Sequence, residues 1–305
     1  MTGLVVLEKM GMLVLLMAVG FAAAKANWVG DGFNQATSRL VANVFLPASI
    51  LSSVIGVAPL FSGKELAVVI AGTFVLFGLC AAGGLVVSKV VPMPKQDQLV
   101  AWLSIFFMNN VFVGFPVVQA IFGEEALFCA SLTNLPFNLL LYTVGVASLR
   151  VGAGRVRFRE VLTPPLLATL AGVGLFLAGL SLPALAVDTL STLGAVTVPM
   201  SMVVVGVSLS HVPMREAFLD GRAWVVSLVR LLLCPLAAWW VLGLFLPAGG
   251  LTLGVLTVIA ACPSAAMVTI LSVRFGADDS LASKINFLST LLCAVTLPVI
   301  TWFLL

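Results

Sequence analysis

Ten apolar segments, each of about 20 residues or more, occupy almost the whole sequence. They cover residues 4–26, 37–61, 66–90, 99–121, 126–149, 161–180, 184–210, 219–246, 250–273 and 281–304. A helix needs about 20 apolar residues to cross the hydrocarbon core of a bilayer. Of the 305 residues, 61% are apolar and 9% are charged, whereas a soluble domain is about 25% charged. The sequence therefore predicts an all-α polytopic membrane protein with ten transmembrane helices.

Basic residues are distributed unevenly between the two sides that ten alternating spans define. One side receives twelve of the 15 basic residues: Lys25, Arg39, Lys89, Lys95, Arg150, Arg155, Arg157, Arg159, Arg215, Arg222, Arg274 and Lys284. The other side receives Lys9 and Lys64, and Arg230 lies within a span. Because cytoplasmic loops carry the excess of Lys and Arg, we expect a multi-pass protein of the cell inner membrane with both termini on the non-cytoplasmic side.

Several landmarks recur at half the length of the chain. Pro47-Ala48-Ser49 returns as Pro199-Met200-Ser201 after 152 residues, and Phe122-Gly123 returns as Phe275-Gly276 after 153. Each half holds five spans, an odd number, so the second half enters the membrane from the opposite side. We therefore expect an inverted 5+5 repeat, with residues 1–152 (helices 1–5) as the first repeat and residues 153–305 (helices 6–10) as the second. Many secondary transporters have this arrangement, with the binding site near the membrane midplane.

Two segments contain residues that interrupt a helix. The fourth segment carries adjacent amides at Asn109 and Asn110, followed by Gly114 and Pro116, and the ninth carries Pro263 and Ser264. The offset of 153 residues makes Asn110 and Pro263 repeat partners. Irregular backbone at membrane depth is tolerated where it lines a cavity or contacts protein, and the N-terminus of a half-helix attracts anions. The pattern predicts breaks in helices 4 and 9 and an anion site beside them; the alternative is that the prolines only kink packed helices.

Arg230 is a cation within the eighth segment. It follows Arg222 by eight residues, which places it on the order of 12 Å deeper along a helix. One interpretation is that Arg230 attracts or pairs with a carboxylate substrate. The other is that its long side chain extends to the headgroups.

Other polar residues are weaker candidates for the binding site. Asn134 and Asn138 are one helical turn apart and share a face, and Ser49 and Ser201 are repeat partners that follow prolines. These four residues either line the site or hold helices together by hydrogen bonds and close packing.

The sequence argues against several other classes of protein. It contains no Walker-type phosphate loop, no Asp or Glu at the centre of a span, and no arrangement typical of a membrane protease. A net charge of +3 does not favour a nucleic-acid partner. The five cysteines lie in apolar runs without paired spacing, so we expect small buried side chains and no metal site. We expect no enzymatic activity and no cofactor.

At the interrupted segments the sequence resembles the auxin efflux carrier family, which includes the plant PIN carriers and bacterial carriers associated with malate and malonate. The resemblance extends over the whole chain. It is most specific from Asn109 to Pro116 and from Cys262-Pro263-Ser264 through Phe275-Gly276 to Leu297-Pro298. It implies that helices 4 and 9 cross at their breaks and hold the substrate there, with the family's helix 4 asparagine at Asn109. Plant carriers have proline where this chain has Met108, which predicts a softer break.

These observations lead to one favoured hypothesis and two alternatives. We expect a bacterial-type secondary carrier of a small organic anion, a mono- or dicarboxylate that is auxin-like or malate- or malonate-like. The resemblance implies that helices 1, 2, 6 and 7 form a scaffold, and that the crossing bundle moves to give alternating access. The alternatives are a sodium-coupled symporter of the bile-acid type and a membrane sensor that transports nothing. The sequence does not specify Na⁺ or H⁺ coupling, the direction of transport, or whether the chain forms a homodimer.

Overall fold

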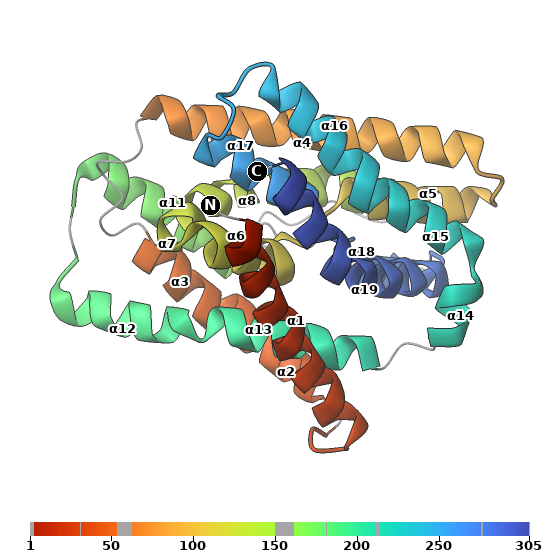
Figure 1. Ribbon diagram of the computed structural model, residues 1–305, viewed down its shortest axis with the longest axis horizontal. Coiled ribbons are helices and arrows are strands. Elements are labelled where there is room, and N and C mark those ends of the chain that lie inside the picture. Colours follow the sequence, from red (N-terminus) through yellow and green to blue (C-terminus); the bar gives the residue numbers. More distant parts are fainter. Residues whose placement is uncertain are drawn as a thin grey trace. The chain divides into compact units, whose positions relative to one another are not determined.

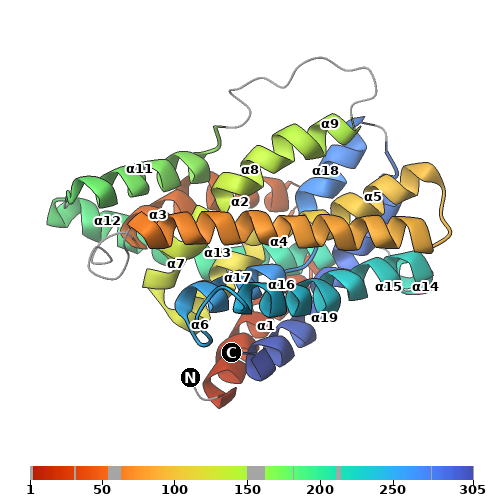
Figure 2. The same ribbon diagram turned by 90° about the horizontal axis from the view of Figure 1, so that it is seen from above.

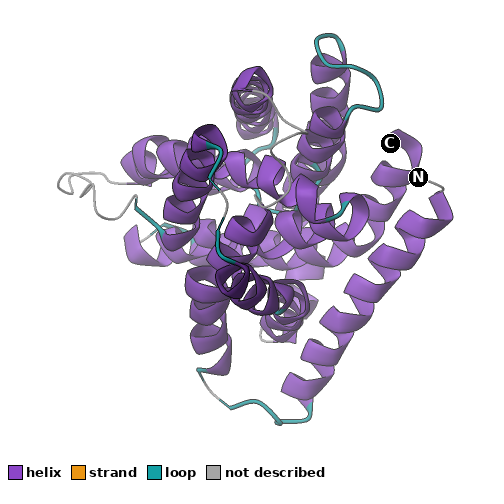
Figure 3. Ribbon diagram, turned by 90° about the vertical axis from the view of Figure 1, so that its left-hand side faces the viewer, coloured by secondary structure: helices purple, strands orange, loops and turns teal. Residues whose placement is uncertain are grey.

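The structure is a computed structural model, and it describes residues 3–30, 32–53, 63–149, 162–180, 182–210, 214–275 and 277–304. These residues form helices joined by loops (Figure 3). Helical residues occupy all ten predicted segments. Within the described parts of the chain, five helices are long and apolar enough to cross a membrane: Gly63–Val90, Glu124–Leu149, Ala184–Ser210, Gly221–Gly243 and Ser280–Leu304. The predicted all-α architecture with membrane-length helices is confirmed.

The chain divides into two compact units, and each draws on both halves of the sequence. Unit 1 comprises Met1–Ala71, Val111–Pro136 and Leu162–His211, and unit 2 comprises Gly72–Asn110, Phe137–Val161 and Val212–Leu305. The predicted repeat boundary between residues 152 and 153 lies outside the described residues. The compact units are therefore distinct from the proposed sequence repeats, which remain a prediction about ancestry.

Unit 1 contains most of the helices from the first, second, sixth and seventh predicted spans, together with α6 and α7 (Figure 1). Its elements are α1 (Gly3–Lys25), α2 (Phe33–Leu40), π-helical turn η1 (Val41–Phe45), α3 (Leu46–Ser53), α6 (Phe115–Phe122), α7 (Glu124–Leu132), α11 (Pro164–Ala178), α12 (Ala184–Ala195) and α13 (Thr197–Ser210). The π-helical turn η2 (Asn110–Gly114) leads into α6.

Two glycines let α1 and α13 approach each other closely within unit 1 (Figure 1). A Cβ atom built on Gly206 would lie 1.9 Å from the Met17 carbonyl oxygen, and one built on Gly20 would lie 2.2 Å from that of Val203. Small residues allow this backbone-to-backbone packing, which stabilises helix pairs in a lipid environment where hydrophobic burial gives little driving force. At one end of the pair, Lys25 Nζ donates to the Ser210 carbonyl oxygen at 3.1 Å.

Unit 2 contains the two interrupted segments. Its elements are most of α4 (Gly63–Val90), α5 (Lys95–Phe106), η3 (Leu141–Gly145), α9 (Val146–Leu149), α14 (Met214–Leu219), α15 (Gly221–Leu228), η4 (Val229–Leu233), α16 (Cys234–Gly243), α17 (Leu251–Ala260), α18 (Ala266–Phe275) and α19 (Asp279–Leu304); α8 (Asn134–Leu140) begins in unit 1 and ends in unit 2. The helical segment formed by α15, η4 and α16 passes alongside α4 (Figure 2), where a Cβ atom on Gly83 would lie 3.8 Å from Cys234 Sγ.

Candidate functional site

The candidate site is built where two helices of unit 2 stop short. Helix α5 ends at Phe106, and α17 ends at Ala260, well before α18 begins at Ala266. Phe107 has extended backbone angles, φ −98° and ψ 127°. Both helices are thus interrupted within the predicted segments, as the sequence pattern indicates.

The two non-helical stretches pair with each other as a short antiparallel bridge between Met108 and Ser264. The Asn109 N–H donates to the Pro263 carbonyl oxygen at 2.9 Å, and the Ala265 N–H donates to the Phe107 carbonyl oxygen at 3.0 Å. These two bonds satisfy buried backbone groups that would otherwise lack partners in an apolar setting. We call residues 107–109 and 262–265 the paired break.

The position of the break differs from the sequence expectation. Gly114 and Pro116 lie beyond the interruption: Gly114 has helical angles and ends the π-helical turn η2, and Pro116 follows it in the first turn of α6. Met108 faces Ser264 in the bridge, while the residues on either side of the pair make its two hydrogen bonds and the Met108 carbonyl oxygen accepts from the Asn110 N–H. The expectation of a softer break at Met108 stays a prediction.

A new helix N-terminus opens directly after the paired break. Helix α18 begins at Ala266, and Met267 in its first turn is 36% exposed. First-turn N–H groups have no intrahelical acceptor and carry a partial positive charge. Beside them, the Ser264 N–H donates to Ser289 Oγ at 3.2 Å, while Ser264 Oγ has no hydrogen-bond partner among the described residues. Asn109 is 8% exposed. Hydroxyl, amide and N–H donors beside a positive helix end suit a carboxylate.

Arg230 lies in unit 2 behind the paired break and is fully buried. Its Nε donates to the Cys262 carbonyl oxygen at 3.1 Å, and its Nη1 contacts the Ile105 carbonyl oxygen at 3.4 Å and Cys80 Sγ at 3.1 Å. The interpretation that the Arg230 side chain extends to the headgroups is therefore wrong, because its guanidinium group points inward and donates to main-chain carbonyl oxygens. Arg230 Nη2 has no hydrogen-bond partner among the described residues.

The electrostatic surroundings explain how a buried guanidinium is tolerated there. Ile105 lies in the last turn of α5, and Cys262 follows the end of α17. A helix C-terminus carries roughly half a negative charge on its unsatisfied carbonyl groups. The two helix ends together offset about one positive charge, which is the charge of an arginine side chain at any accessible pH. Among the described residues, no carboxylate forms a salt bridge with Arg230.

An aromatic cluster packs against the same part of unit 2. The Phe77 ring contacts those of Phe106 and Phe107, with ring centroids 5.4 and 6.2 Å apart, and the Phe107 ring meets Phe137 edge-on at 5.7 Å. A Cβ atom on Gly145 would lie 2.8 Å from the Phe107 ring. Glycine at position 145 therefore allows η3 to approach the paired break.

The remaining predicted site residues are divided between the units. Asn138 is 6% exposed and belongs to unit 2, together with Asn110, which is 1% exposed. Asn134, Ser49 and Ser201 are buried residues of unit 1. Within that unit, the backbone and Cβ of Ser49 pack against Gly194 of α12, where a Cβ on the glycine would come within 2.8 Å. This close contact supports the packing interpretation for Ser49, while the roles of the other residues remain predictions.

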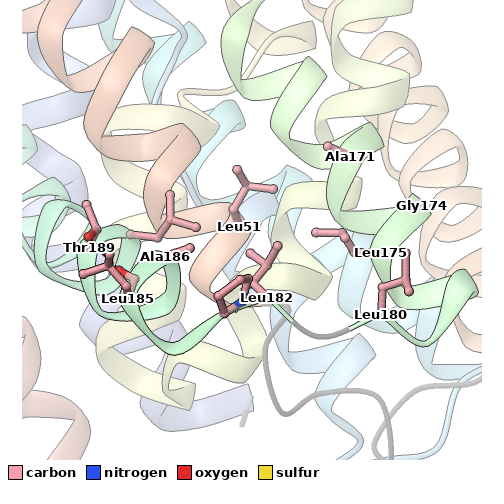
Figure 4. Close-up of a pocket in the computed structure, with 11 residues that line it drawn as sticks. Leu51, Ala171, Gly174, Leu175, Leu180, Leu182, Leu185, Ala186 and Thr189 are labelled. Atoms are coloured by element: carbon pink, nitrogen blue, oxygen red, sulfur yellow. Dashed lines mark hydrogen bonds between the residues drawn. The ribbon is translucent and has the colours of Figure 1, made fainter.

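Unit 1 also contains an apolar groove of about 840 Å³ (Figure 4). It is lined by side chains of α3, α11, α12 and the segment between α11 and α12, among them Leu51, Leu175, Leu182 and Leu185, and Thr189 carries the one hydroxyl among the described residues that line it. Because a carboxylate needs buried donors, this groove is a poorer match for an anion than the paired break.

The sequence alone did not identify the partners of Arg230. Cys80 and Cys262 are buried free cysteines, as are Cys129, Cys234 and Cys293, so the expectation of small buried side chains is confirmed. Nothing in the sequence signals that the Ile105 and Cys262 carbonyl groups face a guanidinium, because any residue supplies a carbonyl. In the sequence, the interrupted fourth and ninth segments were the only indication that helix ends lie near Arg230.

Membrane-length helices combined with a polar break in the interior define a polytopic membrane transporter. Comparison with known proteins agrees: the family model described as "Membrane transport protein" matches residues 5–158 and again 147–301. The chain therefore belongs to the membrane transport protein family, which is the auxin efflux carrier family that its sequence resembles. The match of one model to both halves supports an internal duplication. Members of this family are transporters and not enzymes.

The curated relatives are also described as transporters. An "uncharacterized transporter" of Methanothermobacter thermautotrophicus is 29% identical over 291 residues, which cover 93% of this chain and 94% of the relative. An "uncharacterized transporter" of Methanocaldococcus jannaschii is 26% identical over 309 residues, with 96% of each chain covered. These similarities extend over nearly the full length of both relatives.

Proposed function

We propose that this transporter is a secondary carrier of a small organic anion, a mono- or dicarboxylate, which binds at the paired break. The observation that carries the proposal is the bridge between Met108 and Ser264, because it combines a new helix N-terminus, a buried amide and a buried hydroxyl in one place. Arg230 balances the negative ends of α5 and α17, so that these helix ends do not repel an anion at the paired break.

Each group has a distinct role in the proposed carrier. The Asn109 amide and the first N–H groups of α18 donate to the substrate carboxylate, and Ser264 Oγ supplies a further donor. Arg230 neutralises the ends of α5 and α17 and holds them in place. Asn110, Pro263, Asn134, Asn138 and Ser201 are proposed to shape the site. Alternating access follows from movement of the crossing bundle of an inverted ten-helix repeat.

A thermal-unfolding screen of the purified protein tests the substrate class. A ligand that binds only the folded state raises the melting temperature. We expect a mono- or dicarboxylate to raise it, whereas a neutral analogue of the same shape, such as the corresponding amide, does not. Each compound is tested with and without Na⁺, since stabilisation that requires Na⁺ favours the bile-acid type of symporter. Stabilisation by neutral or cationic compounds alone would contradict the proposal.

The proposed orientation makes a separate prediction, based on the distribution of basic residues. Arg155 and Arg159 lie outside the described residues, and they are expected to face the cytoplasm while both termini face away from it. A single cysteine at position 155, in a variant without the five native cysteines, should react with a membrane-impermeant maleimide only after the cells are opened. Labelling of that cysteine in intact cells would show the opposite orientation.

A further inference from the structure

Helix α19 lies alongside one of the two stretches of the paired break within unit 2. Ser289 Oγ of α19 accepts the Ser264 N–H at 3.2 Å. One turn further along, Cys293 Sγ contacts the Ala261 carbonyl oxygen at 3.9 Å. Residues four apart on a helix share a face, so one face of α19 follows the chain from the end of α17 to Ser264. Ser289 is fully buried on that face.

The Ser289 hydroxyl uses both its donor and its acceptor capacity. It donates to the Asn286 carbonyl oxygen of its own helix at 3.3 Å and accepts the Ser264 N–H. The bond to Asn286 is common for serines in helices, whereas the bond to Ser264 joins segments that are 25 residues apart in the sequence. A buried N–H group without an acceptor is costly, so Ser289 stabilises the backbone of the paired break.

The hydrogen bonds of the paired break determine which donors remain for a ligand. The Ser264 N–H is taken by Ser289, and the Ala265 N–H is used within the break itself. The next two N–H groups, those of Ala266 and Met267, meet no acceptor among the described residues. Ser264 Oγ also lacks a partner there, and its residue is only 1% exposed. The remaining donors are therefore a buried hydroxyl and two N–H groups at a positive helix end.

We propose that Ser289 is a positioning residue of the anion site. By holding the Ser264 N–H, it fixes the backbone that leads into α18, so that the Ser264 hydroxyl and the first two N–H groups of α18 meet one carboxylate together. The inference rests on the proposed carrier function, because it concerns the same site. Donors that are fixed before binding cost less free energy to order. Without Ser289 Oγ, the competent geometry is less populated and the apparent dissociation constant rises accordingly.

Carboxylate titrations of the purified full chain test this role, with acetate and malonate as probes. Ser289→Ala should weaken binding about 3- to 10-fold, which corresponds to one ordinary hydrogen bond. Ser289→Thr keeps the hydroxyl and should bind more tightly than Ser289→Ala. Ser131 supplies the matched control, since it is a fully buried serine of unit 1 whose hydroxyl donates within its own helix, to the Phe128 carbonyl oxygen at 2.7 Å. Ser131→Ala should keep the affinity of the parent.

A second substitution shows whether Ser289 acts through Ser264. Ser264→Ala removes the hydroxyl that is proposed to contact the carboxylate but keeps the N–H that Ser289 accepts. If Ser289 positions that hydroxyl, Ser289→Ala should cost less affinity in the Ser264→Ala background than in the parent, because the two changes share one effect. A general loss of packing would give equal costs in both backgrounds.

Amide hydrogen exchange without a carboxylate separates this inference from the carrier proposal. Peptides that include residues 262–268 should exchange faster in Ser289→Ala than in the parent, since the Ser264 N–H loses its acceptor, and Ser131→Ala should leave them unchanged. If no carboxylate binds the parent, the carrier proposal is overturned. If carboxylates bind the parent and Ser289→Ala equally well, or if exchange is unchanged in Ser289→Ala, only the positioning role is overturned.

Discussion

Replacement of Arg230 by methionine is expected to lower the free energy of unfolding by about 2 to 6 kcal/mol. The Arg230 side chain is fully buried and donates hydrogen bonds to the carbonyl groups of Ile105 and Cys262. Its loss leaves two buried acceptors without donors, at about 1 to 3 kcal/mol each. It also leaves two negative helix ends facing each other. Thermal unfolding of the purified protein should show a decrease in melting temperature of roughly 3 to 9 °C.

Two further variants separate charge from geometry. Arg230→Lys keeps the positive charge but loses the planar fork, so its melting temperature should lie between those of the parent and Arg230→Met. Arg215→Met makes the same substitution at an exposed position of α14 and should melt like the parent. If Arg230→Met melts within a degree or two of the parent, the guanidinium does not hold the helix ends.

Replacement of Asn109 by alanine is expected to weaken carboxylate binding about 5- to 150-fold, which corresponds to the loss of a buried hydrogen bond of about 1 to 3 kcal/mol. The paired break should persist, because Asn109 joins it through its main-chain N–H, which alanine retains. The measurement is a carboxylate titration of the parent and the variant by calorimetry or thermal shift.

Asn34 provides a control that separates loss of a binding-site amide from the general effect of replacing an asparagine by alanine. The Asn34 side chain donates to Ser208 Oγ at 2.7 Å within unit 1. Asn34→Ala should lower stability slightly and leave carboxylate affinity unchanged. Equal affinity losses in both variants, or an unchanged affinity in Asn109→Ala, would remove Asn109 from the binding site.

The helices of this protein could be predicted because membrane spans depend on composition over about 20 residues. The break at Asn109 and Asn110 was also predictable, since amides and nearby proline disfavour an uninterrupted span. Its exact place was not predictable. Gly114 and Pro116 look like helix breakers in the sequence, yet both sit in helical turns, where the π-helical turn η2 passes into α6. A π-helical turn is one way in which a helix continues past an interruption of its regular hydrogen bonds.

The partners of Arg230 depend on tertiary structure that sequence periodicity does not encode. The spacing of eight residues from Arg222 gives the depth of Arg230 along the helix but not the direction in which its side chain points. The sequence therefore could not distinguish an inward side chain from one that extends to the headgroups. In the structure the Arg230 side chain points inward, because the ends of α5 and α17 both lie beside η4. The carbonyl groups at these two helix ends balance the charge of Arg230 in place of a carboxylate. The ion pairs that join Asp97, Asp220, Arg222 and Lys284 were missed for a similar reason, since they link segments that lie far apart in the sequence.

The central claim is that an organic anion binds at the paired break. A crystal structure with a bromine-substituted analogue of the best carboxylate from the thermal screen tests it most directly, because bromine gives an anomalous signal that locates the ligand independently of its shape. We predict a bromine peak beside Asn109 and the first turn of α18, with the carboxylate within hydrogen-bond distance of the Asn109 amide or the N–H groups that follow Pro263. A peak in the apolar groove around Leu51 and Leu175, with none at the paired break, would contradict the claim.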